Sequence, residues 1–454
     1  MSTNISRRKV VAGAAWAAPV VAASAAVPAF ASSTVCEWES TAAYTAEGTS
    51  AGAKGTTSFI VPALVDKIKF EVVGGAGGTN YDDIAAGSGA KITGIIEVKE
   101  GQTVQLVGAA GGIGNGPLSP AEGGEGYGNG GSSNLPTPIP ASVMQRVNAI
   151  WPADSTLKRI IYSASGGGSS ALVINGTPVA VAGGGGGAGF VNSGGANNNP
   201  NYAEPGAVDA GRLWPTGAKR NAYPVIGSTG GSADGAAGSA GNQGSLTYSA
   251  DTSVTTTVNA GEGGSAGIGG NGGAKTDLPT GTSPNGVLGF SSANNQEIYH
   301  SSKSGNNGGS GFTGAGGDGV GSYSYLIDNN DSTQKEVGTH NGTTYALEYS
   351  SIGHNFNGYQ SVISAGGGAG YGGGGSGAST SASAIVLTQK WNNNPNGIRQ
   401  NVGFAQFGGG GGAGGSYVAP GVSGSVIESA GNAPTARSTR GNGYVKVTLC
   451  KRTA

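Results

Sequence analysis

The chain has 454 residues and a formal net charge of −1, and only 11% of its residues are charged. Glycine contributes 92 residues, about three times its usual share. The mildly acidic balance argues against nucleic acid or an anionic membrane as a partner, and the recurrent β-branched and aromatic residues argue against a disordered chain.

Residues 1–31 resemble an export signal. Arg7 and Arg8 precede a mildly apolar, alanine-rich stretch, in the order typical of a twin-arginine signal. Val10 stands where that pattern most often has phenylalanine, so a general secretory signal is the alternative. The small-residue motif that ends the stretch predicts cleavage between Ala31 and Ser32.

Both export routes lead out of the cytoplasm. We therefore expect a secreted, extracellular or cell-wall-associated protein whose mature chain, residues 32–454, is a single glycine-rich β domain. No apolar run in this part is long enough to cross a bilayer, so we expect no transmembrane anchor in the mature chain.

The two cysteines, Cys36 and Cys450, lie near opposite ends of the mature chain. In an oxidising compartment, two distant cysteines indicate a disulfide, with two unpaired surface thiols as the alternative. The segment YVKVTLC, which ends at Cys450, alternates like a strand. A disulfide would place this last strand beside the segment CEWESTAAYTA, which begins at Cys36.

Alternation of apolar and polar residues predicts strands along much of the chain. In FIVPALVDKIKFEVVGG, the side chains of Ile68, Phe70 and Val72 share one face. The segment AKITGIIEVKEGQTVQLVG predicts two strands on either side of Glu100-Gly101. Further strands are predicted at LTYS, VTTTV, YSYLI, AIVLTQKW and GYVKVTLC.

Two Asn-Gly pairs, Asn175-Gly176 and Asn341-Gly342, predict hairpins, because a type I′ turn needs two residues that tolerate positive φ. The first turn would set Leu172 opposite Val179. Pro178 lacks a backbone donor, so its strand should lie at an edge or pair irregularly at that point.

Residues 136–165 depart from the strand pattern. Val143, Val147 and Ile150 have helical spacing, and Pro152 follows them. We expect a helix of one or two turns there, inside an inserted loop.

Glycine-rich tracts such as AGGGGGAGF, AGGGAGYGGGGSGA and FGGGGGAGGSYV lie between the strands. They have no fixed period, which excludes a collagen-like repeat. Flexible linkers would be polar and serine-rich, whereas these tracts adjoin β-branched residues and aromatic residues such as Phe190 and Tyr417. Ordering each glycine costs about 1–2 kcal/mol, so other contacts must offset that cost. We expect extended tracts that pack backbone against backbone and bond to one another.

A family resemblance is carried by TTSFIVPALVDKIKFEVVGGAGG, GQTVQLVGAAGG, SALVINGTPVAVAGGGGGAG, FGGGGGAGGSYV and GNGYVKVTL. In this order, over about residues 56–449, the chain resembles bacterial secreted glycine-rich proteins and the glycine-rich extracellular region of the anaplastic lymphoma kinase and leukocyte tyrosine kinase receptors. The resemblance implies a mainly β fold with little α-helix: a jelly-roll-like β-sandwich with an inserted bundle of polyglycine-II-like helices. It implies little about function, although the receptor region binds protein ligands. The chain lacks the receptors' transmembrane and kinase parts and their extra cysteines.

Catalytic motifs are no more frequent than chance predicts. Two G-x-S-x-G strings, centred on Ser50 and Ser265, are about as many as this glycine content produces, and neither joins a predicted strand to a predicted helix. His300, His340 and His354 lack metal-ligand spacing. We therefore expect no enzyme, no cofactor and no metal.

Ligand binding is harder to judge from the sequence. Trp391, Trp214 and Trp151 are candidate ligand-contact aromatics, with packing against the core or the glycine tracts as the alternative. Trp391 adjoins NNNPNG, a turn-rich segment expected at the surface.

The leading hypothesis is a non-enzymatic structural or adhesive protein that displays loops on a rigid glycine-rich scaffold. Its partners would be cell-envelope components, surface glycans or further copies of itself. The first alternative is a soluble module that recognises a carbohydrate or a protein ligand. An enzyme and an ice-binding protein are more remote alternatives.

Overall fold

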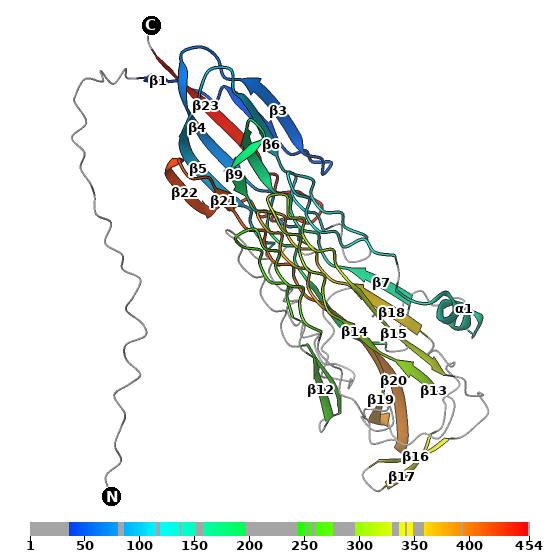
Figure 1. Ribbon diagram of the computed structural model, residues 1–454. Coiled ribbons are helices and arrows are strands. Elements are labelled where there is room, and N and C mark those ends of the chain that lie inside the picture. Colours follow the sequence, from blue (N-terminus) through cyan, green and yellow to red (C-terminus); the bar gives the residue numbers. More distant parts are fainter. Residues whose placement is uncertain are drawn as a thin grey trace, which may run out of the picture.

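Two groups of β-sheets lie at opposite ends of the molecule, with glycine-rich tracts between them (Figure 1). We call the sheets beside the two ends of the described chain the proximal sheets, and the others the distal sheets. The computed structural model describes residues 36–79, 86–114, 119–136, 138–150, 158–196, 244–249, 252–256, 259–275, 296–328, 336–340, 343–347, 358–391 and 394–452. Within these residues the fold is mainly β, and almost all strand pairs are antiparallel.

The two proximal sheets curl into half of a barrel around one hydrophobic core. The alternating residues Ile68, Phe70 and Val72 are buried in this core, as predicted, and meet Leu106 and Leu172 of the second sheet. The first sheet has the order β1 (Cys36–Trp38), β23 (Tyr444–Arg452), β4 (Val65–Val73), β5 (Ala90–Glu97) and β22 (Ser423–Ser429), and β2 (Tyr44–Glu47) also pairs with β23. The second has the order β21 (Tyr417–Val418), β9 (Thr177–Ala182), β8 (Ser170–Ile174), β6 (Thr103–Gly108) and β3 (Gly55–Ile60).

The predicted turn at Glu100-Gly101 is confirmed, and Gly101 has a φ of 80°. The strands on either side of it do not pair with each other. Strand β5 belongs to the first proximal sheet and β6 to the second, so this turn carries the chain across the core.

The β8–β9 hairpin turns at Asn175-Gly176, as predicted, with φ values of 48° and 79°. The predicted pairing of Leu172 with Val179 is wrong, because Leu172 lies opposite Ala180. The register shifts next to Pro178, which has no N–H to donate to the ladder. Proline therefore makes the pairing irregular, as its chemistry predicts, and moves the rest of the strand by one residue.

The distal sheets pack on each other through small hydroxyl side chains. The Oγ atoms of Ser322 and Ser379 lie 2.7 Å apart, and those of Ser324 and Ser381 lie 2.9 Å apart, all fully buried. One sheet has the order β13 (Gln296–Tyr299), β15 (Gly321–Asp328), β18 (Gly358–Ile363) and β7 (Lys158–Tyr162), with β18 and β7 parallel. The other has the order β10 (Phe190–Ala196), β20 (Asn394–Gly408), β19 (Ser379–Trp391) and β14 (Ser301–Lys303). Two hairpins, β11 (Gly244–Ser249) with β12 (Thr252–Thr256) and β16 (Glu336–His340) with β17 (Thr343–Leu347), complete the described strands.

The helix α1 (Ala141–Ile150) lies within residues 136–165, where helical spacing predicted one. Its ten residues make nearly three turns, more than expected. Val143 is buried, together with Ile139, against tyrosines of the first distal sheet.

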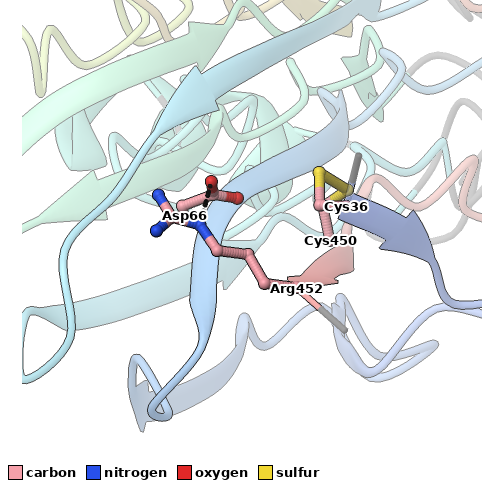
Figure 2. The surroundings of a disulfide bond; sticks show 4 residues. All are labelled: Cys36, Asp66, Cys450 and Arg452. Carbon is pink, nitrogen blue, oxygen red and sulfur yellow. Dashed lines mark hydrogen bonds and ion pairs between the residues drawn. A yellow bond between two sulfur atoms is a disulfide. The ribbon is translucent and has the colours of Figure 1, made fainter. Parts of the chain in front are cut away.

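The predicted disulfide between Cys36 and Cys450 is confirmed, with Cα atoms 5.3 Å apart across a sequence separation of 414 residues (Figure 2). It joins β1 to β23, and both β1 and β2 pair with β23, so the pairing of the first and last strands is also confirmed. Arg452 donates from Nε to Asp66 Oδ2 at 2.8 Å beside the disulfide. The last strand is therefore held by a covalent bond and an ion pair.

Candidate functional site

The glycine-rich tracts form an extensive network of backbone hydrogen bonds in the middle of the molecule. Most of these bonds join one tract to another that is distant in sequence. We call this part the glycine region and define it as residues 74–79, 86–89, 109–114, 121–133, 164–169, 183–188, 259–273, 304–319, 364–378 and 408–416.

The tract of residues 183–188, fully buried, shows how the bonds are organised. Four of its amides donate to carbonyl groups of two neighbouring tracts, and the same neighbour recurs at every third residue. Gly184 and Gly187 donate to Ala369 and Gly366 at 2.7 and 2.9 Å, and Gly185 and Ala188 donate to Gly75 and Gly78 at 2.9 and 3.0 Å.

The donors to the carbonyl groups of this tract also recur at every third residue, and they come from three further segments. Each of these bonds therefore joins the tract to another segment. Gly183 and Gly186 accept from Ala90 and Gly87 at 2.9 and 3.1 Å, Gly184 and Gly187 from Gly414 and Gly411 at 2.9 and 3.0 Å, and Gly185 and Ala188 from Gly167 and Ala164 at 2.9 and 3.0 Å.

Neighbouring carbonyl oxygens occupy the space that a side chain would need. A Cβ atom added to Gly185 would lie 1.9 Å from the carbonyl oxygen of Gly87, and one added to Gly186 would lie 2.0 Å from that of Gly411. Real Cβ atoms essentially never approach another heavy atom closer than 3.0 Å. Alanine does occur in the tracts, at the fully buried Ala188 and Ala369, so the steric demand is specific to position.

Serine and asparagine side chains take the place of a neighbouring carbonyl in several bonds of the glycine region. This role was not predicted from the sequence, although Ser and Asn residues stand within and beside the glycine runs. The acceptors are Ser416 Oγ for Gly183 at 3.1 Å, Ser169 Oγ for Gly128 at 2.8 Å, Ser376 Oγ for Asn306 at 2.8 Å and Asn307 Oδ1 for Gly272 at 2.9 Å.

Asn432, between β22 and β23, ties the proximal sheet to the glycine region. Its Oδ1 accepts from the amide of Gly89 at 3.0 Å, and its Nδ2 donates to the carbonyl of Gly74 at 3.0 Å. This half-buried side chain makes the kind of bonds that a neighbouring backbone makes elsewhere in the network.

Substituting Asn432→Ala is expected to lower the free energy of unfolding by about 2–3 kcal/mol, because a backbone amide and a carbonyl lose their partner. Asn259→Ala is the matched control, since Nδ2 of Asn259 makes one exposed bond, to Ala274. That change should cost less than about 1 kcal/mol in denaturant unfolding. Equal costs for the two variants would contradict the bridging role of Asn432.

The motif serines lie in turns that lack the geometry of a nucleophile. Ser50 is exposed in a tight turn closed by the amide of Gly52 on the carbonyl of Thr49. Ser265 is exposed and bridges to Ile268 across a two-residue turn. In the described residues that follow the two serines, 51–79 and 266–275, there is no helix of the kind that an esterase-like elbow requires.

His300, between β13 and β14, is half-buried, and burial lowers its pKa to about 4. His340 ends β16, and His354 lies outside the described residues. The described part of the chain contains no cluster of three or more His, Cys, Asp or Glu side chains that could hold a metal ion.

His300 predicts a dependence of stability on pH. In the unfolded chain its pKa is near 6.5, so the unfolded state takes up the proton first as the pH falls. The free energy of unfolding is therefore highest above pH 6.5, where His300 is neutral in both states, and it decreases as the pH falls from 6.5 toward 4. We expect His300→Gln to abolish about 2 kcal/mol of the stability difference between pH 7.5 and pH 4.5. Identical pH profiles of unfolding for the two proteins would contradict this.

Of the candidate tryptophans, Trp391 is the last residue of β19 and pairs in register with Asn394 of β20. Trp151 and Trp214 lie outside the described residues, as do Ala31 and Ser32 at the predicted cleavage site. Within the described ranges, the helix α1 is too short and too polar to cross a membrane.

No model of a known protein family matches the chain, and none of the curated proteins compared with it has a similar sequence.

Proposed function

We propose that the protein is an exported, non-enzymatic structural or adhesive protein of the cell surface, in which the glycine region is a rigid scaffold. The observation that carries the proposal is the three-residue repeat of hydrogen-bond partners along residues 183–188. A linker between domains would need no such bonds, whereas a load-bearing spacer requires them.

The repeat supports a finer description of the fold. We propose that the tracts are polyglycine-II-like helices packed in a bundle, since each tract bonds sideways to several neighbours and has the three-residue period of that geometry. The shared core of the proximal sheets supports their description as a β-sandwich from which the bundle extends. Both features are those implied by the resemblance to the glycine-rich receptor region.

Export through a twin-arginine-type signal fits the disulfide, because disulfides persist in oxidising compartments. The scaffold would hold the distal strands away from the ends of the described chain (Figure 1). Cell-envelope components, surface glycans or other copies of the chain are the partners we propose for the distal end.

Fractionation of the producing cell tests this proposal. The protein should be recovered from the wall or the medium, and Arg7→Lys combined with Arg8→Lys should retain it in the cytoplasm. Unchanged export of that variant would favour the general secretory signal instead. Recovery of the unchanged protein from the cytoplasm would contradict the proposal.

A recognition module is the second candidate, and the position of Trp391 favours it. This residue is the last of β19 and pairs with Asn394 of β20, so under this candidate it belongs to a distal binding surface. A glycan array with the full chain and with Trp391→Ala separates the two candidates. A defined glycan lost in the variant supports recognition, and no binding supports the structural role.

A further inference from the structure

Three tyrosines stack on one face of the first distal sheet. Tyr299 of β13 lies opposite Tyr325 of β15 and diagonally opposite Tyr323. The ring centroids of Tyr299 and Tyr323 are 4.8 Å apart, with 27° between the planes. Tyr299 and Tyr325 are 5.3 Å apart with 13° between the planes.

Tyr299 and Tyr323 are also joined by a side-chain hydrogen bond, which brings their phenol groups together. Burial, followed by this bond, raises the pKa of Tyr323 to about 12. The stacked arrangement, with ring centroids 4.8 Å apart, places carbon atoms of the two phenols side by side. Tyr299 is 37% exposed and Tyr323 is half-buried, so an oxidising radical in solution can reach the pair.

We propose that Tyr299 and Tyr323 are a site of oxidative cross-linking, at which hydrogen peroxide and a haem peroxidase join them as dityrosine. Each phenol loses one electron and one proton, and the two phenoxyl radicals form a carbon–carbon bond between their ortho positions. The two ring hydrogens at that bond transfer to the oxygens and restore both phenols. Hydrogen peroxide accepts the two electrons and two protons and becomes two water molecules.

The bond would join two neighbouring strands, β13 and β15, at the end of the molecule opposite the Cys36–Cys450 disulfide. This inference stands on ring geometry and does not depend on the proposed function. A second tyrosine pair is close but not stacked. Tyr371 and Tyr417 have ring centroids 5.0 Å apart, but their planes are tilted by 56° and both rings contact Phe312.

The test treats the purified full-length chain with hydrogen peroxide and a peroxidase, then reads dityrosine fluorescence and tryptic peptide masses. Lys303 separates the two rings, so Tyr299 is the only tyrosine of peptide 276–303, and Tyr323 lies in peptide 304–335. We expect these peptides to be linked within monomers, with a mass equal to their sum less two hydrogen atoms. Tyr323→Phe should reduce the amount of this linked product at least tenfold, and Tyr325→Phe should leave that amount unchanged.

Several results would overturn the proposal. These are the absence of the linked peptides, links found only between separate copies, and a product that survives Tyr323→Phe but is lost in Tyr325→Phe. Both substitutions remove a single hydroxyl from half-buried rings, and retention of the circular dichroism spectrum shows that each variant is folded. A variant with an altered spectrum is replaced by Tyr299→Phe, which must abolish the same product.

Discussion

Replacing Gly185 by alanine is expected to lower the free energy of unfolding by more than about 4 kcal/mol or to prevent folding. The new methyl group would lie 1.9 Å from the carbonyl oxygen of Gly87. Overpacking of side chains costs about 1–3 kcal/mol, because side chains can rotate away. The obstacle here is backbone, and the amide of Gly87 is itself bonded to the carbonyl of Gly186, so the cost should be larger.

Gly309→Ala is the matched control. The nearest atom to a Cβ at this exposed residue is the backbone nitrogen of Ala315, 3.0 Å away, so a small shift makes room for the methyl group and the same change should cost only about 1 kcal/mol. Denaturant unfolding followed by circular dichroism, together with the yield of soluble protein, compares the two variants. Similar stabilities would contradict the view that close backbone packing selects glycine in the tracts.

Removing the disulfide should have the second largest effect. The variant with Cys36→Ser and Cys450→Ser is expected to lose about 2–5 kcal/mol, because the bond closes nearly the whole chain and restricts the unfolded state. Denaturant unfolding of the variant and of the unchanged protein, each with and without a reducing agent, provides the measurement.

The reducing agent should destabilise the unchanged protein to the level of the variant and have no effect on the variant itself. Arg452→Gln serves as the control, since it removes the neighbouring ion pair to Asp66 and leaves the disulfide intact. An ion pair with an exposed arginine contributes about 0–1 kcal/mol. A loss on cysteine replacement no greater than that of Arg452→Gln would show that the disulfide contributes little.

The proximal sheets were predictable because their strands show a clear alternation of apolar and polar residues and a recognisable turn sequence. Alternation placed Ile68, Phe70 and Val72 in the core, and Asn175-Gly176 fixed its turn through the positive φ values that it tolerates. The register of Leu172 was not predictable, because the position at which a proline shifts a ladder depends on the neighbouring strand.

The distal sheets were harder to predict for a chemical reason. In β15, Ser322 and Ser324 pack against the other distal sheet, whereas a reading based on hydrophobicity assigns serine to solvent. Burial of Ser322 and Ser324 depends on hydroxyl partners from a strand more than fifty residues away, and no local pattern indicates them.

The glycine region was predictable in kind and unpredictable in detail. The abundance of glycine next to β-branched residues predicted close backbone packing between tracts. The identity of each neighbour was not readable, because glycine has no side chain to specify a partner. Part of that specificity lies in residues such as Ser416 and Asn432, whose side chains bond to particular tract amides.

Amide hydrogen exchange, measured residue by residue in the folded protein, tests most directly whether the glycine tracts are ordered through bonds to one another. We predict that Gly184, Gly185, Gly187 and Ala188 exchange about as slowly as the buried strand β4, through opening free energies close to that of global unfolding. Exchange of these four amides at the rate of an unstructured glycine chain, with β4 still protected, would contradict the account.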